Sequence, residues 1–213
     1  VLLRPLGSAD KIHVVSSGIW VNQYAENPAP IAVSHPALVF TGKMDYRPNV
    51  DAMMWFVEDI LSLIQQKLAD IHLYIVGQQP HARLEGFKNH PHITITGKVD
   101  SVLPYLYEAD VYIAPLRMGS GTRLKLLEAM ACGCAIISTT IAASGLNETV
   151  KSALILADTP SDIADHILTL LDNQQKRTTM GALAKHHVAT AYDWSAILPD
   201  VLAVYAWLGL KVN

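Results

Sequence analysis

Cysteine is scarce in this sequence. Of its 213 residues only Cys132 and Cys134 are cysteines, and Gly133 separates them. Two cysteines are too few for a framework of disulfides, and no histidine–cysteine cluster has the spacing of zinc ligands. We therefore expect no metal site and a reducing compartment, the cytoplasm.

Long apolar runs and an excess of charge are also missing. No stretch of about 18 apolar residues is present to cross a bilayer, and no signal peptide opens the chain. The formal net charge of −3 gives no broad attraction to nucleic acid or to an anionic membrane, so any anion site must be local. The chain starts at Val1 without a methionine and soon enters structured-looking sequence, so we expect a fragment of a longer protein.

Apolar residues are abundant instead. They make up 51% of the chain, and the mean hydropathy is +0.24, which predicts a large packed core. Apolar segments predicted as buried strands lie at residues 37–42, 71–77, 93–97, 110–115, 134–139 and 153–156. Segments of helical periodicity alternate with most of them. This alternation predicts a Rossmann-like, three-layer α/β/α fold with a parallel sheet of about six strands.

The sequence divides into three segments. Residues 1–36 are expected to form an N-terminal segment and linker, with a strand near 11–15. Residues 37–160 form the Rossmann-like domain. Residues 161–213 contain three predicted helices, the last of them rich in large apolar side chains, and these helices are expected to pack on that domain.

A glycine-bearing stretch joins the fourth predicted strand to a predicted helix. Gly119 and Gly121 free the backbone, and helical spacing starts at Thr122. A strand, a glycine loop and a helix start bring unpaired N–H groups and the positive end of a helix dipole to one place, where an anion can bind. Arg123 and Lys125 oppose that dipole unless an anion is present. The stretch therefore predicts a phosphate site.

The same stretch also has an ordinary interpretation. Gly-x-Gly between a strand and a helix is often only a tight connection, and basic residues in a first helical turn are often solvated. Glu128 can be a surface carboxylate paired with Lys125 rather than a ligand contact. Spacing alone leaves these alternatives open.

Cations follow the carboxyl ends of several predicted strands. They are Lys43, Arg47, Lys98, Arg123 and Lys125. In an open parallel sheet, ligands bind outside the carboxyl ends near a switch in strand order, so these side chains can converge on one crevice. Any one of them alone is more readily explained as a solvated loop residue. Their number is what favours an anion site.

Five blocks of the sequence resemble one family. They are residues 40–51, 73–77, 95–99, 109–116 and 119–133, and the last contains Gly-Ser-Gly-Thr-Arg-Leu-Lys-Leu-Leu-Glu-Ala-Met-Ala. Together they resemble the nucleotide-sugar-dependent glycosyltransferases of the GT-B fold, family 4 or "group 1". The last block is similar to a branch of bacterial sugar transferases.

The resemblance implies two Rossmann-like domains, the first for the acceptor and the second for the nucleotide-sugar donor. Residues 37–160 are similar to the second, so we expect the N-terminal acceptor domain of the same protein to be missing and this chain alone to be inactive. In the family a closing helix crosses back onto the first domain, and the predicted helix at 194–208 would correspond. Its apolar face, left uncovered, would allow self-association.

The resemblance also implies roles for residues of the glycine-bearing stretch. Glu128 corresponds to a glutamate whose carboxylate accepts hydrogen bonds from the ribose hydroxyls of the donor. The backbone of Gly121, Thr122 and Arg123 would face the diphosphate. Ser120 stands where the family has another glutamate, which contacts the transferred sugar, so the contacts to the sugar are open.

Two further segments match donor-binding parts of the family. Gly42 and Lys43 match a Gly-Arg pair whose cation binds the diphosphate, and Gly97, Lys98 and Val99 match the segment that lines the base. A lysine usually follows the Gly-Arg pair by about five residues, but a proline and an asparagine occupy that region here. The nearest cation that could replace it is Arg47.

The implied function is transfer of a sugar from a nucleoside diphosphate sugar to an acceptor, with retention at the anomeric carbon, in polysaccharide or glycoconjugate biosynthesis. Lys43, Arg123 and Lys125 would act as catalytic cations that stabilise the departing diphosphate. No cofactor or metal is then required, and no Asp-x-Asp pair suggests one. The expected place is the cytoplasm, with peripheral contact at the inner membrane face.

Two other functions stay open. A non-catalytic nucleotide-sugar-binding module would explain Ser120 and the missing domain. A nucleotide-sugar epimerase shares the two-domain fold, although the acid and base carboxylates that it requires are not visible in this sequence.

Overall fold

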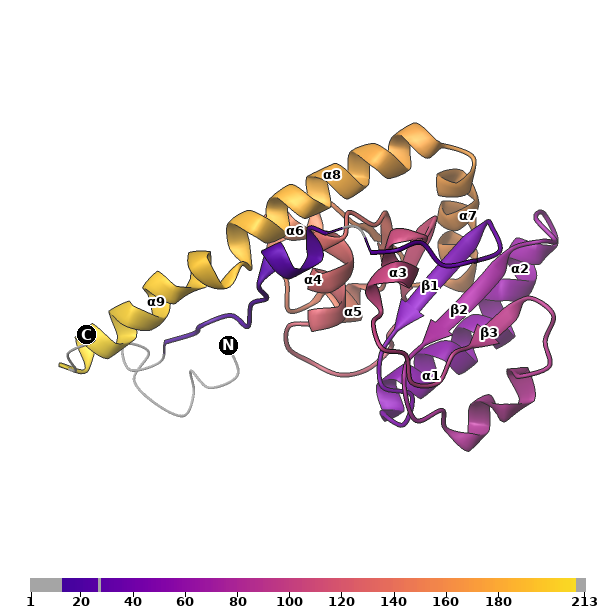
Figure 1. Ribbon diagram of the computed structural model, residues 1–213, viewed down its shortest axis with the longest axis horizontal. Helices are drawn as coiled ribbons and strands as arrows, with labels where there is room; N and C mark the ends of the chain where they lie inside the picture. Colours follow the sequence, from indigo (N-terminus) through magenta and orange to yellow (C-terminus); the bar gives the residue numbers. More distant parts are fainter. Residues whose placement is uncertain (1–12, 27, 210–213) are drawn as a thin grey trace.

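The computed structural model describes residues 13–26 and 28–209, and its centre is a parallel sheet of six strands (Figure 1). The strand order is β3-β2-β1-β4-β5-β6. The strands are β1 (Ala37–Thr41), β2 (His72–Val76), β3 (Ile93–Ile95), β4 (Val111–Ala114), β5 (Ile136–Ser138) and β6 (Ile155–Leu156). Each lies within one of the predicted segments, and the Rossmann-like α/β prediction is confirmed.

The central strand β1 is buried on both faces of the sheet. All five of its residues are buried, which is typical of a strand between two layers of helices. Leu38 lies opposite Leu73 of β2 on one side and opposite Val111 of β4 on the other. The strand order therefore switches direction between β1 and β4, and a crevice opens at their carboxyl ends.

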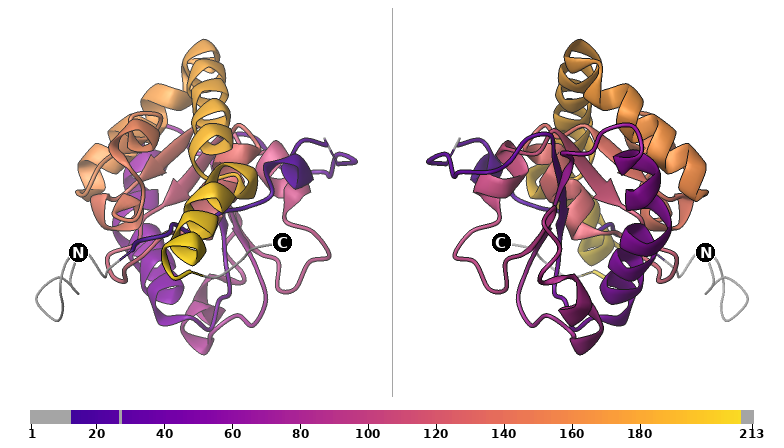
Figure 2. Two further views of the ribbon diagram at one scale, coloured as in Figure 1. Left: turned by 90° about the vertical axis from the view of Figure 1, so that its left-hand side faces the viewer. Right: turned by 90° about the vertical axis from the view of Figure 1, so that its right-hand side faces the viewer.

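Helices fill the connections on both faces of the sheet (Figure 2). The π-helical segment η4 contacts α1, α2 and α7, whereas α8 contacts α4, α6 and α7. The helical elements are η3 (Val21–Tyr24), α1 (Arg47–Trp55), η4 (Phe56–Leu61), α2 (Ser62–Gln65), η5 (Ala82–Phe87), α3 (Leu103–Tyr107), α4 (Leu124–Ala131), α5 (Thr140–Ala143), α6 (Glu148–Lys151), α7 (Pro160–Leu171), α8 (Gln174–Ala191) and α9 (Trp194–Trp207).

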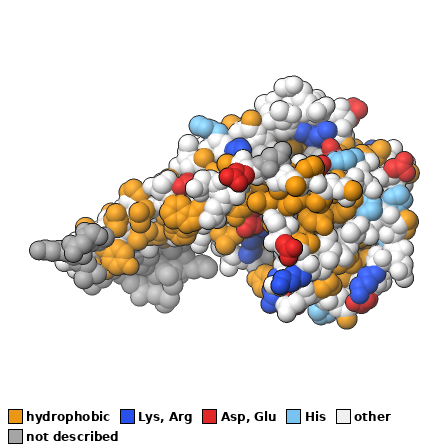
Figure 3. All heavy atoms as spheres, in the orientation of Figure 1, with side chains coloured by type: hydrophobic (Ala, Val, Ile, Leu, Met, Phe, Trp, Pro, Cys, Tyr) orange, Lys and Arg blue, Asp and Glu red, His pale blue; other side chains and the backbone are white. Residues whose placement is uncertain are grey.

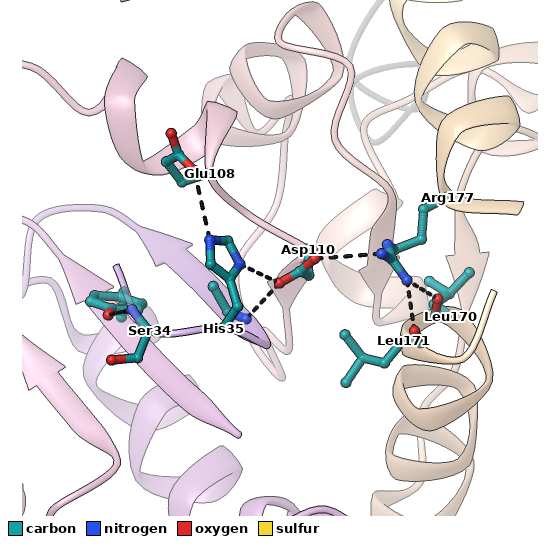
Figure 4. Close-up of polar contacts among 9 residues, drawn as sticks. Ser34, His35, Glu108, Asp110, Leu170, Leu171 and Arg177 are labelled. Carbon is teal, nitrogen blue, oxygen red and sulfur yellow. Dashed lines mark hydrogen bonds and ion pairs between the residues drawn. The ribbon is translucent and has the colours of Figure 1, made fainter. Parts of the chain in front are cut away.

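One carboxylate fastens the amino end of the sheet (Figure 4). Asp110, directly before β4, accepts a hydrogen bond from the N–H of Ala37 at 2.8 Å, and His35 Nδ1 lies 2.7 Å from the same oxygen. Its other oxygen is 3.5 Å from Arg177 of α8, which also donates to two backbone carbonyls at the end of α7. Asp110 therefore joins two strands and two helices.

The predicted strand near 11–15 differs from the structure. His13–Val15 are not in a strand, and Lys11 and Ile12 lie outside the described residues. The ring of His13 is 4.8 Å from the ring of Trp207. This segment runs beside α9 and not along the sheet (Figure 1).

Ile19 ties the first described segment to the start of α9. Its N–H donates to the carbonyl of Tyr192 at 2.9 Å, and its own carbonyl accepts from the N–H of Trp194 at 3.0 Å. Between these two residues, Asp193 caps α9 and also accepts from the N–H of Val21 at 2.9 Å. The incoming segment and α9 are thus joined at one point.

Helix α9 does not pack on the sheet as the other C-terminal helices do. Among its residues only Ile197 is buried, and the helix projects from the body of the molecule (Figure 1). Hydrophobic side chains lie along this projecting arm (Figure 3). The large exposed ones are Leu198, Leu202, Tyr205 and Trp207. Helix α9 therefore has the uncovered apolar face that we expected of it, and the packing expected of the three C-terminal helices on the domain leaves most of α9 unburied.

Candidate functional site

A cavity of about 360 Å³ lies at the carboxyl ends of β1 and β2, beside the first turns of α4. It is built from the loops that follow three strands and from one helix. Its lining residues are Thr41, Gly42, Lys43, Val76, Gly77, Gln78, Lys98, Val99, Val102, Lys125 and Glu128. The structure thus brings three of the five predicted cations and the predicted ribose-binding glutamate to one crevice.

Two glycines allow the loops after β1 and β2 to meet at this cavity. Gly42 and Gly77 have φ angles of +153° and +151°, in the region that favours glycine. A Cβ added at Gly77 would lie 1.8 Å from the carbonyl oxygen of Gly42. The two loops therefore contact each other through their backbones, and no side chain of Gly42 or Gly77 occupies the cavity that they line.

Lys125 points into the cavity from the first turn of α4. Its Nζ lies 2.7 Å from Oδ1 of Asn49 and 4.0 Å from the centre of the Phe40 ring. Burial, and to a smaller degree the charge of Arg123, lower the pKa of Lys125 to about 7, against the opposing effect of Glu128. A lysine in this state is only partly charged at neutral pH, and an anionic ligand would complete its protonation.

Glu128 lies one turn further along α4 and also lines the cavity. Its Oε1 accepts a hydrogen bond from the hydroxyl of Tyr24 at 3.2 Å. Burial raises the pKa of Glu128, while the bond from Tyr24 and the charge of Lys125 act against that rise. The same contact and burial raise the pKa of Tyr24, so Tyr24 stays a hydrogen-bond donor at physiological pH. The second oxygen of Glu128 is left to accept from a ligand.

Tyr24 belongs to the segment that the sequence identifies only as a linker. It is held in place by the hydroxyl of Tyr107, which donates to the carbonyl of Tyr24 at 2.6 Å. No local sequence pattern indicates this contact, because 104 residues separate Tyr24 from Glu128. The contact between Tyr24 and Glu128 was therefore not predicted from the sequence.

The remaining predicted cations are placed differently from one another. Lys43 lies at the exposed rim of the cavity, where it pairs with Asp45 at 3.0 Å, and Lys98 lines the cavity from the loop after β3. Arg47 is exposed at the start of α1 and does not line the cavity. Its expected contact with the diphosphate has no support in this geometry.

The segment predicted to line the base lies beside the loop after β2. Gly97 pairs with Gly77 in an isolated bridge, which brings the loop after β3 against the loop after β2. Val99 and Lys98 then line the cavity, whereas Gly97 stands behind them. Their assigned role toward the base stays a prediction.

The glycine-bearing loop lies beside this cavity rather than in its wall. Arg123 is in extended conformation and caps α4, so the helix begins at Leu124 and not at Thr122 as predicted. The guanidinium of Arg123 turns back and donates to the carbonyl of Ser120 at 2.9 Å. Thr122 packs against Gly145, to whose carbonyl its hydroxyl donates at 3.5 Å. The catalytic role expected of Arg123 and the ligand contacts expected of this loop stay predictions.

The loop nevertheless carries free donors. In the described part of the chain, the N–H groups of Gly121, Thr122 and Arg123 have no hydrogen-bond acceptor. Nε of Arg123 is buried and likewise lacks a partner among the described residues. Unpaired donors at a helix start are the feature on which anion binding depends.

The described residues contain neither a group of metal ligands nor a helix that could cross a membrane. Over residues 13–26 and 28–209, no three histidine, cysteine, aspartate or glutamate side chains are grouped so that they could hold a metal ion. No helix within the same residues is long and apolar enough to span a membrane.

Comparison with known proteins identifies a family. A family model described as glycosyl transferases group 1 matches residues 35–173. The phosphatidyl-myo-inositol mannosyltransferase of Mycobacterium tuberculosis is 30% identical over an alignment of 168 residues that covers 73% of this chain and 44% of that protein. An uncharacterised 44.6 kDa protein in the cps region of Klebsiella pneumoniae is 25% identical over 213 residues, covering 91% of this chain and 53% of that protein. The chain thus spans about half the length of these curated relatives.

Solved structures share the fold at low sequence identity. Anabaena Alr3699/HepE, solved in complex with UDP, superposes with a TM-score of 0.74 at 15% identity and covers 96% of this chain and 60% of that chain. WaaG, a glycosyltransferase involved in lipopolysaccharide biosynthesis, gives a TM-score of 0.69 at 16% identity over 94% of this chain and 57% of that chain. The family model covers well over half of the sequence, and the chain belongs to the group 1 glycosyl transferases.

Proposed function

We propose that this chain is the donor-binding part of a glycosyltransferase that takes a sugar from a nucleoside diphosphate sugar. The observation that carries the proposal is the charge layout of one cavity. Lys43, Lys98 and Lys125 supply positive charge around it, and the carboxylate of Glu128 stands one helical turn from Lys125. A nucleoside diphosphate needs both: cations for the diphosphate and a fixed acceptor for the ribose hydroxyls.

The same residues supply what the transfer step requires. When the bond between the anomeric carbon and the diphosphate breaks, negative charge grows on the leaving oxygen. Lys125 and Lys43 would stabilise that charge, and the unpaired N–H groups of Gly121 and Thr122 lie at the neighbouring helix start. We propose transfer with retention and without a metal or cofactor, as expected from the family resemblance.

The acceptor side belongs to a part of the protein beyond this chain. The relatives are about twice as long, and α9 carries exposed Leu198, Leu202, Tyr205 and Trp207 on an arm that leaves the domain. We propose that an acceptor domain covers this arm, that the isolated chain binds donor without transferring it, and that exposure of the arm drives self-association. Relatives named for a mannosyltransferase and for a cps region support a role in glycoconjugate or polysaccharide biosynthesis. We propose the cytoplasm or its membrane face as the place, as the sequence led us to expect.

The test is calorimetric titration of the chain with UDP, GDP and ADP. We expect saturable binding of one of them, and Glu128→Ala should weaken it by about tenfold because the ribose hydroxyls lose a charged acceptor. The matched control is Glu148→Ala, which removes an exposed carboxylate of α6 that pairs with Lys151.

Two outcomes would contradict the proposal. Equal affinity of the wild type and Glu128→Ala would remove the ribose assignment. Absence of binding by every nucleotide, both in this chain and in the full-length protein, would leave no donor site at all. Binding by the full-length protein without transfer would instead identify a non-catalytic module.

A further inference from the structure

A buried amide beside the cavity has no part in the proposed chemistry. Asn49 lies in the first turn of α1 and is only 4% exposed. Its Oδ1 accepts a hydrogen bond from Nζ of Lys125 at 2.7 Å, and its Nδ2 donates to the carbonyl of Lys43 at 2.8 Å. One side chain thus connects the loop after β1 to the lysine of α4.

This connection determines where the Lys125 ammonium lies. A lysine side chain has four rotatable bonds, and holding it at one place requires an anchor near its charged end. Here the anchor consists of the Asn49 oxygen on one side and the Phe40 ring, 4.0 Å away, on the other. A Cβ on Gly42 would come within 2.6 Å of the ammonium, so the glycine leaves the required space.

We propose that Asn49 is a positioning residue that presents the Lys125 ammonium to the diphosphate of the donor. The proposal rests on the donor site described above and names the residue that prepares it. Asn49 does not touch the reacting atoms. It acts through Lys125, which it orients, and through the backbone of Lys43, which it holds.

The chemistry of the amide explains why asparagine suits this position. A carboxylate here would form an ion pair with Lys125 and cancel the positive potential that a diphosphate needs. The amide oxygen accepts the same hydrogen bond but carries no net charge. The other charged groups facing the lysine are Arg123 and Glu128 of α4, and Lys43 and Lys98 at the cavity wall. The ammonium is therefore oriented without being neutralised by its anchor.

The first test measures Lys125 directly and needs no ligand. The lysine side chains of the chain are labelled with ¹³C and followed by NMR through a pH titration, and Lys125→Met identifies the signal. Asn49→Asp should raise the pKa of Lys125 because it adds a negative partner, whereas Asn49→Ala should lower it because the ammonium loses its acceptor. Opposite shifts are not expected of a residue that merely stabilises the fold. An unchanged pKa in both variants would overturn the proposal.

The second test measures affinity for the nucleotide that binds the wild type, or for inorganic pyrophosphate if none does. Both Asn49→Ala and Asn49→Asp should weaken binding by about tenfold, the first through disorder of the ammonium and the second through its neutralisation. The matched control is Asn173→Ala, which removes a helix cap of α8 far from the cavity and should change only stability.

These outcomes separate the two proposals. If Lys125→Met weakens binding and both Asn49 variants bind like the wild type, the donor site stands and the role of Asn49 is wrong. If the pKa of Lys125 responds to Asn49 but neither a nucleotide nor pyrophosphate binds, the anchor exists and the donor site fails, and with it the presentation of Lys125 to a diphosphate.

Discussion

The two ends of the sheet use polar groups in opposite ways. At the amino end, Asp110 meets a backbone N–H, His35 and Arg177, and the arginine has further acceptors on α7. At the carboxyl end, Lys125 has one neutral partner and a pKa lowered to about 7 by burial. Polar groups that stabilise a fold have all their hydrogen-bond and ion-pair partners within the protein. Polar groups that bind a ligand keep some capacity for hydrogen bonds or ion pairs that the fold does not use. Variants at the two ends should therefore separate stability from binding.

The largest effect is expected for Lys125→Met. Loss of the central cation should weaken nucleotide binding by about a hundredfold, and wild-type affinity should fall as the pH rises through about 7, where Lys125 loses its proton. The variant should lack that pH dependence. Calorimetry at several pH values checks both expectations, and a wild-type affinity independent of pH would contradict them.

The same variant should be more stable than the wild type. Because the pKa of Lys125 is lower in the folded state than the ordinary value of 10.5, the unfolded chain holds the proton more tightly, and wild-type stability rises with pH between about 7 and 10.5. Below pH 7 both states are protonated and the full cost of burying the charge remains. Lys125→Met should therefore gain on the order of 1–2 kcal/mol below pH 7, and less as the pH rises. Denaturant unfolding at pH 6 and pH 9 measures the difference.

Asp110→Ala should instead lower stability and leave nucleotide affinity nearly unchanged. Removing this carboxylate leaves the N–H of Ala37 without an acceptor and takes one of its acceptors from the guanidinium of Arg177, which we expect to cost about 2 kcal/mol of unfolding free energy. Nucleotide affinity of the folded variant should stay within about twofold of the wild type, well below the change that one lost hydrogen bond produces. If Asp110→Ala folds normally but loses nucleotide affinity, the assignment of stability to the amino end and binding to the carboxyl end of the sheet is wrong.

The smallest effect is expected for Tyr24→Phe. This variant removes only the hydroxyl that donates to Glu128, at 3.2 Å, and keeps the ring. Nucleotide affinity should fall about threefold, because Glu128 loses the bond that orients it. Tyr107→Phe is a useful comparison, since it frees the Tyr24 backbone and leaves the hydroxyl in place. Equal affinity in all three proteins would show that the linker has no influence on the donor site.

The elements of this fold were predictable because their signals are local. Strands such as Ala37–Thr41 are short apolar runs with turn residues at their ends, and such runs identify buried strands without knowledge of their partners. The glycine spacing also placed a loop before α4. The start of that helix was misplaced, since Arg123 takes an extended conformation that its own sequence does not require.

The contacts that the sequence did not predict join residues far apart in the chain. Asn49 and Lys125 are 76 residues apart, and the linker residue Tyr24 reaches Glu128 over a longer distance still. Neither pair leaves a periodic or compositional trace. The apolar residues of α9 likewise indicate that a surface needs covering, but not what covers it.

The junction at Ile19 has a mechanical consequence. Because Ile19 is bonded on both sides of Asp193, a force applied to α9 is transmitted to the segment that leads to Tyr24. Tyr24 is only five residues further along, and its hydroxyl is bonded to Glu128. The projecting arm and the carboxylate of Glu128 are therefore the two ends of one short linkage, through which a movement of the arm would be transmitted to the cavity.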